Sequence, residues 1–340
     1  MTTIAPILRS IANGAELSVS ELEAAFTAIL SGNVSDIQVS AFVMGLAVRG
    51  ETGAELLAGA RVMRSHARTL EISGDVLDTC GTGGLGWASL NTSTASAIVI
   101  AACGGKVAKH GNRSTPPKTG SADVLEALGV ELDLSPDRFN ACIESVGVGF
   151  MFARSHHSAM RHVAPVRADL GIRTIFNLLG PLSNPANATH QVLGVYDSCW
   201  LRPMAEALCA LGVKRAWIVH GRDGIDELSI AGTSDVVEVA DGSLREFVIE
   251  PKDAGLTSSP LSALEGGSPD QNATAIRDIF EGRPGPFRDA VVLNAAAGLV
   301  VLGKADDLLA GAQQAATAID TGKALETLTR LAAISQGEKS

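Results

Sequence analysis

Cysteine is scarce and scattered in this sequence. The 340 residues contain five cysteines, at Cys80, Cys103, Cys142, Cys199 and Cys209. None belongs to a CxxC pair, so the spacing matches neither a zinc site nor a disulfide framework. We therefore expect free thiols, and a reducing compartment for the protein.

The chain also lacks a basic excess and any long apolar run. It has 27 Lys and Arg against 37 Asp and Glu, which gives a formal net charge of −10. This balance argues against nucleic acid or an anionic membrane as a partner, because such surfaces attract basic proteins. No stretch reaches the roughly 18 apolar residues of a membrane span, and the N-terminal residues have no apolar signal region. We predict a cytoplasmic protein in which any anion-binding surface is local.

The first part of the chain has the pattern of a small helical domain. Apolar residues recur at helical spacing, and Ser20-x-x-Glu23 and Thr52-x-x-Glu55 fit the capping-box pattern of helix starts. Gly32 and Gly50 stand where helices should end. We predict an all-helical domain over residues 1–72, with no evident chemistry of its own.

From residue 73 to 340 the pattern changes to that of an α/β domain. Short β-branched runs alternate with helical segments, which predicts a mostly parallel sheet joined by helical crossovers. The expected strands include residues 76–77, 106–108, 192–195, 216–219 and 236–237. Ala- and Leu-rich stretches at 290–302 and 305–319 predict long helices in the C-terminal part.

A glycine loop, Gly81-Thr82-Gly83-Gly84, follows the first of these strands. Asn91-Thr92-Ser93-Thr94 comes next, just before an apolar helical run, so we expect Ser93 or Thr94 near the helix N-cap. Glycines let a ligand approach the backbone, and the free N–H groups of a helix start favour an anion. The loop therefore predicts a phosphate site.

A second polar loop follows the next strand. It carries Lys109, His110, Asn112, Arg113 and Ser114, and continues to Gly120-Ser121. Two cations and several hydrogen-bond donors suit a polyphosphate better than a single carboxylate. One such loop fits an ordinary turn with solvated charges equally well, but two in tandem favour a phosphate site.

Long motifs give the chain a resemblance to a known family. They are GTGG, NTST, KHGNRS and GSADVLEALGV, then HHSAMRHVAPVRADLGIRTIFNLLGPLSNP from His156, HGRDGIDELS from His220 and LNAAAGLVVLG. The sequence resembles the anthranilate phosphoribosyltransferases of tryptophan biosynthesis over nearly its whole length. The resemblance implies transfer of the phosphoribosyl group of phosphoribosyl pyrophosphate (PRPP) to the amino group of anthranilate. It also implies Mg²⁺ as cofactor, a homodimer formed through the helical domain, and a helical domain joined by part of residues 160–190.

The resemblance also implies which residues bind each substrate. For PRPP they are Gly81, Gly84, Leu85, Ser89, Asn91, Thr92, Ser93, Thr94, Lys109, His110, Gly111, Asn112, Arg113, Ser114 and Ser121. For anthranilate they are Gly81, Asn112 and Arg167. A guanidinium is a natural bidentate partner for a benzoate carboxylate, although an arginine on a helix is by default a surface residue.

Two sets of residues are candidate metal ligands, and the sequence pattern favours only one of them. His156, His157 and His162 are separated by one, five and six residues, which does not match the helical spacing of ligand pairs. Asp226-Glu227 lies in a glycine-containing turn just beyond an expected strand, and hard Mg²⁺ takes one or two carboxylates plus phosphates and waters. The family match places Mg²⁺ at these two residues and at Ser93.

The chain departs from the family pattern in both loops. The family usually has Asp after GTGG, where this chain has Leu85, and a Ser pair where it has Pro116-Pro117. Leucine offers no oxygen, and proline has no N–H for a phosphate. We expect an active enzyme with a weakened PRPP–metal site, unless Leu85 and the proline pair have adapted to each other.

The reaction requires orientation and charge neutralisation more than acid–base chemistry. Loss of pyrophosphate develops negative charge on the leaving group, and the attacking aniline nitrogen is already neutral. We predict no nucleophile or strong base, but positioning by Lys109, Asn112 and Arg167, with His110 as a pocket wall.

Two alternatives to the transferase function remain open from the sequence. One is a pyrimidine nucleoside phosphorylase of related fold, and the other is a non-catalytic nucleic-acid-binding relative.

Overall fold

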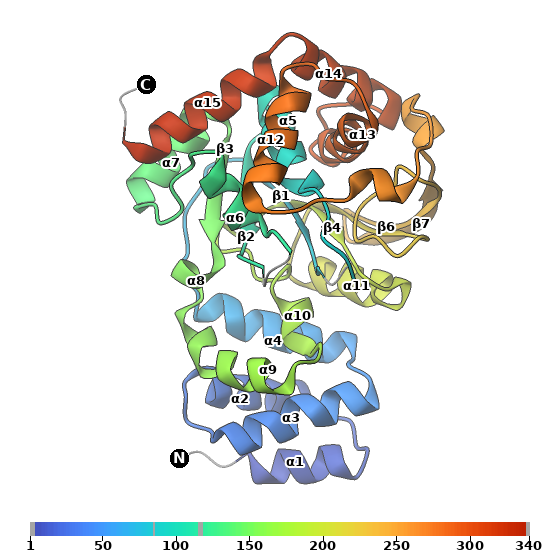
Figure 1. Cartoon of the computed structure of the whole chain (residues 1–340). Coiled ribbons are helices and arrows are strands. Elements are labelled where there is room, and N and C mark those ends of the chain that lie inside the picture. The colour runs from blue at the N-terminus through green and yellow to red at the C-terminus, as the bar shows by residue number, and fades with distance from the viewer. Residues whose placement is uncertain (1–3, 84–85, 115–117, 338–340) are drawn as a thin grey trace.

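The computed structural model describes residues 4–83, 86–114 and 118–337. It has a helical part at the N-terminus and a larger α/β part built on one sheet (Figure 1). The predicted fold class is confirmed. Gly84, Leu85 and Pro116-Pro117, which carry the sequence's departures from the family pattern, lie outside the described residues.

The N-terminal part contains four helices, α1 (Ala5–Ala12), α2 (Val19–Leu30), α3 (Asp36–Arg49) and α4 (Gly53–Ser65). The predicted capping box of Thr52 and Glu55 is confirmed at the start of α4. The one predicted from Ser20 and Glu23 is wrong by two residues. Ser18 is the extended N-cap residue and pairs with Glu21, because α2 already begins at Val19 and includes Ser20 in its first turn.

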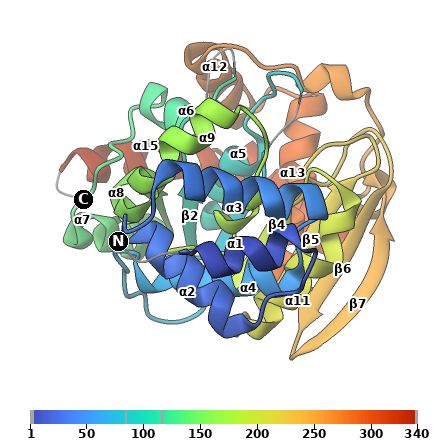
Figure 2. The ribbon, with the colours of Figure 1, turned by 90° about the horizontal axis from the view of Figure 1, so that it is seen from below.

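A later stretch of the chain returns to these helices. It comprises α8 (Ala153–His156), a 3₁₀ turn (Ser158–His162), α9 (Ala164–Leu170) and α10 (Ile175–Leu179). Helices α9 and α10 pack on α3, and α10 also packs on α4. Apolar side chains of α2, α3, α4 and α10 share one buried core. Figure 2 shows α1–α4 and α9 in front of the sheet when the molecule is seen from below.

The sheet has seven strands in the order β3-β2-β1-β4-β5-β6-β7. The first five strands in this order are parallel to one another, whereas β6 is antiparallel to β5 and β7 is antiparallel to β6. The strands are β1 (Leu77–Gly81), β2 (Val107–Gly111), β3 (Val148–Phe152), β4 (His190–Gly194), β5 (Arg215–Gly221), β6 (Ser234–Ala240) and β7 (Ser243–Ile249). Every stretch predicted as a strand overlaps one of these, while β3 and β7 are additional.

Helices cover both faces of the sheet. Side chains alternate along β5: Trp217 and Val219 join the core with α5 and α13, while Ala216 and Ile218 join the core that continues into α11 and the helical part. The remaining helices are α5 (Thr92–Ala102), α6 (Ser121–Ala127), α7 (Pro136–Val146), α11 (Leu201–Ala210), α12 (Pro269–Phe280), α13 (Pro286–Val301), α14 (Leu308–Asp320) and α15 (Lys323–Gln336). Short 3₁₀ turns lie at Ser198–Trp200, Pro251–Ala254 and Leu261–Leu264. Within the described ranges, no helix is both long enough and apolar enough to cross a membrane.

Candidate active site

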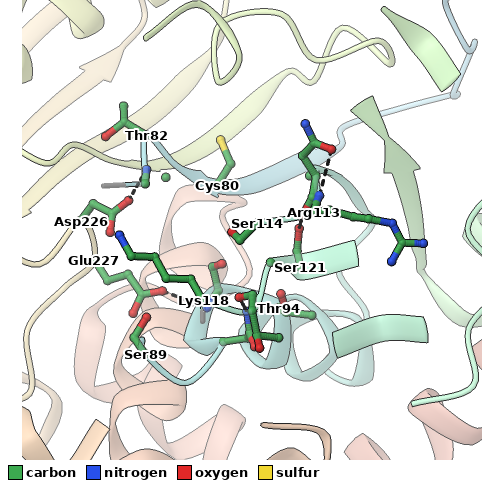
Figure 3. Close-up of a pocket in the computed structure, with 18 of the residues that line it drawn as sticks. Cys80, Thr82, Ser89, Thr94, Arg113, Ser114, Lys118, Ser121, Asp226 and Glu227 are labelled. Carbon is green, nitrogen blue, oxygen red and sulfur yellow. Dashed lines mark hydrogen bonds between the residues drawn. The ribbon is translucent and has the colours of Figure 1, made fainter. Parts of the chain in front are cut away.

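A cleft of about 310 Å³ opens at the carboxyl ends of β1, β2 and β5. In a parallel sheet these ends meet at one edge, which is where ligands of such folds bind. Figure 3 shows side chains from both polar loops, from α5 and from the turn after β5 around this space. The predicted residues that line it are Gly81, Ser89, Asn91, Ser93, Thr94, Lys109, His110, Gly111, Asn112, Arg113, Ser114, Ser121, Asp226 and Glu227.

Two predicted residues within the described ranges lie outside the lining. Thr92 is buried in the first turn of α5. Arg167 lies half-buried on α9, in the helical part that faces the strand ends in Figure 1. Burial lowers the pKa of its guanidinium. Among the described residues, Arg167 has no acidic side chain within ion-pair distance, so this cation has no protein counter-charge in that part of the chain.

The start of α5 and the glycine loop are both hydrogen-bonded to the carboxylate pair Asp226 and Glu227. The backbone N–H of Gly83 donates to Oδ2 of Asp226 at 2.7 Å, and the N–H of Ser93 donates to Oε1 of Glu227 at 3.1 Å. The predicted helix start is confirmed: α5 begins at Thr92, its N-cap residue is Asn91, and Ser93 and Thr94 lie near the cap in the first turn. Asn91 makes no side-chain cap bond, which leaves its amide for other partners.

Glycines on two neighbouring strands make room for Asp226. Gly81 of β1 and Gly194 of β4 lie directly opposite each other in the sheet. A Cβ atom on Gly81 would lie 2.3 Å from Oδ2 of Asp226, and one on Gly194 would lie 1.6 Å from its carbonyl oxygen. Both distances are far below van der Waals contact, so only glycine fits at either position.

The carboxylate pair is costly to ionise in the protein alone. Asp226 is buried, and burial raises the pKa of its carboxyl. Burial also raises the pKa of Glu227 to about 8, and the negative charge of Asp226 adds to that rise. A site of this kind gains stability from a nearby cation, because a positive charge favours the ionised carboxyls.

Lys109 is buried beneath the first loop. Its ammonium group donates to the carbonyl of Thr79 and, at 3.2 Å, to Oγ of Ser93. Burial lowers the pKa of Lys109, while the neighbouring Asp78 carboxylate favours the charged form. Asp78 also accepts the backbone N–H of His110 at 3.0 Å, so one buried acid favours the Lys109 charge and holds the backbone that follows it.

The second loop is organised by acids of α6. The guanidinium of Arg113 lies 3.0 Å from Oδ1 of Asp123 and 2.8 Å from Oε2 of Glu126. Asp123 also accepts the N–H groups of Ser114 and Gly120. Figure 3 shows the Arg113 side chain directed away from Asp226 and Glu227. In this arrangement the positive charge of Arg113 is paired with acids of α6 and is not directed into the cleft.

Two lining side chains carry buried polar atoms without a hydrogen-bond partner among the described residues. They are Oγ1 of Thr94 and Nε2 of His110. Such atoms cost free energy unless a ligand or water meets them. The His110 ring lies 5.1 Å from that of His157, and burial holds the pKa of His110 well below its ordinary value. His110 is therefore neutral at pH 7 and a weak base, which suits a pocket wall.

Metal-binding clusters of three or more His, Cys, Asp or Glu are absent from the part of the chain that the structure describes. A metal in this cleft would therefore rely on Asp226 and Glu227, with its other ligands supplied by substrate and water. Mg²⁺ is usually held in this way.

Several lining residues did not enter the sequence prediction. They include Thr82, Trp87, Lys118 and Thr119. In Figure 3 the amino group of Lys118 is directed toward Asp226 and Glu227. A signal for Lys118 was present in the sequence, namely a cation in the second loop just ahead of Gly120, but the family motifs favoured Lys109 and Arg113 instead.

Two family models define the class of protein to which the chain belongs. Residues 5–67 match the family model described as the helical bundle domain of a glycosyl transferase family, and residues 73–325 match that family's a/b domain. Fold and cleft together are thus those of a glycosyl transferase with a helical bundle and an α/β domain.

The particular family follows from individual relatives. The chain is 65% identical, over 95% of both sequences, to the anthranilate phosphoribosyltransferase of Hyphomonas neptunium. The crystal structure of this enzyme from Thermus thermophilus matches with a TM-score of 0.92 and 45% identity, covering 97% of this chain and 99% of that one. The Saccharomyces cerevisiae enzyme in complex with PRPP and Mg matches at 0.90 and 25% identity, over 98% of each chain. The chain belongs to the anthranilate phosphoribosyltransferase family, and neither alternative function is supported.

Proposed function

We propose that the cleft transfers the phosphoribosyl group of PRPP to the amino group of anthranilate, releasing pyrophosphate. The observation that carries the proposal is the meeting of two loops, one helix N-terminus and a carboxylate pair in one cleft. Such a cleft is suited to an anion and a divalent cation bound together, and PRPP with Mg²⁺ has this combination of charges.

We place the pyrophosphate of PRPP between the glycine loop and the start of α5. Free N–H groups at a helix start favour an anion, and Lys109 and Lys118 bring positive charge to the same cleft. The hydroxyl of Thr94 supplies a donor that has no partner in the described part of the protein. These groups would stabilise the charge that grows on pyrophosphate as the glycosidic C–O bond breaks.

We assign Mg²⁺ to Asp226, Glu227 and Ser93. The two carboxyls fit the ion because burial raises the pKa of each, and a divalent cation offsets that cost. When bound, Mg²⁺ would neutralise charge on the leaving group. The protein's part is to hold the carboxylates through the N–H groups of Gly83 and Ser93.

We place anthranilate on the side of the cleft that faces the helical part. Arg167 would pair with its carboxylate, with Asn112 and Gly81 beside the ring and His110 as a wall. The amino group attacks the ribose carbon that loses pyrophosphate, and the proton it sheds passes to solvent. Because an aniline nitrogen is neutral at pH 7, orientation rather than base catalysis supplies most of the rate.

Anthranilate fluorescence tests the proposal directly. Fluorescence is expected to decay only when enzyme, PRPP and Mg²⁺ are all present, with pyrophosphate released in equal amount. Phosphorolysis of thymidine is the control for the related phosphorylase chemistry, and salt-sensitive DNA binding is the control for a nucleic-acid-binding relative. Persistent fluorescence in the complete mixture would contradict the transferase assignment.

We also propose that the helical domain comprises residues 1–72 with part of 160–190, since α9 and α10 pack against α3. The α/β domain then includes the rest of residues 73–340. A cytoplasmic location fits the five free cysteines, because reducing compartments keep thiols free.

We propose a homodimer formed through α3. An apolar stripe on this helix, Ile37, Ala41, Met44 and Val48, follows helical spacing and faces outward. Ile37 is 82% exposed and Val48 is 81% exposed, although both are large apolar residues. A second copy of the chain would remove this stripe from water.

A charge on the stripe should break the dimer. The double substitution Ile37→Glu and Val48→Glu is expected to halve the mass found by light scattering during gel filtration, because two buried charges per protomer would oppose association. Val248→Glu, on the exposed edge strand β7, is the matched control, since Val248 is 52% exposed. A dimer that survives the α3 substitutions would place the interface elsewhere.

A further inference from the structure

The segment from Leu264 to Asn272 lies against the backbone of the first loop. The N–H of Leu90 donates to the carbonyl of Leu264, and the N–H of Gly266 donates to the carbonyl of Ala88, both at 2.9 Å. A Cβ atom on Gly266 would lie 2.4 Å from the carbonyl carbon and oxygen of Ser89. The two backbones therefore touch where the first loop enters α5.

Asn272, in the first turns of α12, ends this segment and is fully buried. Its Nδ2 donates to the carbonyl of Ser89 at 3.0 Å and to Oδ1 of Asn91 at 2.9 Å. Its Oδ1 accepts the N–H of Gly267 at 2.8 Å. Both N–H bonds of the amide and its oxygen are thus engaged, which leaves the side chain a single orientation.

The same segment also reaches the second loop. Oγ1 of Thr119 donates to the carbonyl of Gly267 at 2.6 Å. Nδ2 of Asn91 donates to the carbonyl of Thr119 at 3.0 Å. Asn91 thus lies between Asn272 and Thr119, and it joins the two loops that line the cleft.

We propose that Asn272 is a positioning residue for PRPP, acting through Asn91. Oδ1 of Asn91 accepts a hydrogen bond from the amide of Asn272. One of the two N–H groups of the Asn91 amide donates to the carbonyl of Thr119. The second N–H is what remains for a ligand, so Asn272 makes Asn91 present a donor, which suits the anionic donor substrate. This inference rests on the proposed function and names a residue outside the cleft lining on which PRPP binding depends.

The substitution Asn272→Asp tests the inference. Aspartate has the same size and still accepts from Gly267, but its carboxylate cannot donate to Oδ1 of Asn91. It should turn the Asn91 amide over and direct the carbonyl oxygen toward the phosphates. The KM for PRPP is expected to rise about tenfold, as the loss of one hydrogen bond to a charged group would cause, with the KM for anthranilate changed less than about twofold.

A double-mutant cycle separates positioning from general damage. In an Asn91→Ala background, Asn272→Asp should change the KM for PRPP by less than about twofold, because the group through which it acts is gone. Effects that multiply in the double variant, or an equal rise in both KM values, would overturn the proposal. Turnover by the unmodified enzyme is measured first, because its absence would contradict the proposed function and not this inference.

Gly266→Ala provides a second route if Asn272→Asp does not fold. Its methyl group would push Ser89 and Leu90 away from the segment, so the KM for PRPP should again rise more than that for anthranilate. Gly232→Ala is the matched control, since a Cβ there has no atom within 4 Å among the described residues. Unchanged PRPP kinetics in Gly266→Ala would also overturn the proposal.

Discussion

Turnover is expected to fall at least about 100-fold when Asp226→Asn and Glu227→Gln are combined. The two amides keep the size of the acids, and their carbonyl oxygens still accept the N–H groups of Gly83 and Ser93. They cannot supply the negative charge that a divalent cation requires. Since changes even to residues behind metal ligands cost about 10–100-fold, removing both ligands should cost more.

A Mg²⁺ titration of steady-state turnover checks this prediction. Any residual activity should need much higher Mg²⁺ than the unmodified enzyme needs. Asp223→Asn is the control in the same turn, because Asp223 is exposed and accepts bonds from Ile225 and Ser229 within the turn. An unchanged Mg²⁺ dependence in the double variant would assign Asp226 and Glu227 to loop structure instead.

Arg167→Ala is expected to lower kcat/KM for anthranilate by at least about 100-fold while leaving the Kd of PRPP nearly unchanged. A bidentate guanidinium–carboxylate pair contains two charge-assisted hydrogen bonds, each contributing about 1.5–3 kcal/mol. Only anthranilate would lose them. The half-buried position of Arg167, with no acidic partner in the described part of the chain, leaves its charge for a ligand.

Two further variants define the role of Arg167. Arg167→Lys keeps the charge but removes the planar fork, so it should restore only part of the activity. Arg161→Ala removes an exposed arginine whose contact is the carbonyl of Ser158, and it should behave like the unmodified enzyme. Equal weakening of both substrates by Arg167→Ala would indicate a structural role.

The sequence predicted the buried strands because their β-branched runs bury both faces. It did not predict β3 or β7. Strand β3 contains Gly149 within a run of Phe and Met residues, a pattern that a buried helix shares. Strand β7 lies at the sheet edge with most of its side chains in contact with water. Charged residues such as Arg245 and Glu246 interrupt the alternation of apolar and polar residues that would indicate a strand.

The two loops of the site were predictable because glycine and hydroxyl residues are chemically distinctive. What was not predictable is how the loops are held. Asn272 contacts Asn91 across 181 positions of sequence, and much of the remaining support is backbone to backbone, which leaves no side-chain signal. The charge of Arg113 was expected at the phosphates, yet α6 places Asp123 and Glu126 beside it.

The paired glycines at the ends of β1 and β4 restrict the substitutions that this site can accept during evolution. As long as Asp226 is present, neither Gly81 nor Gly194 tolerates a side chain, so both positions are closed to neutral drift. A lineage that lost the acid would be free to fill the Gly81 position, whose closest contact is the Asp226 side chain, but not the Gly194 position, which lies against the backbone of residue 226 whatever its side chain. Regaining the acid would then require Gly81 to return as well, so loss of the carboxylate would be difficult to reverse by a single substitution.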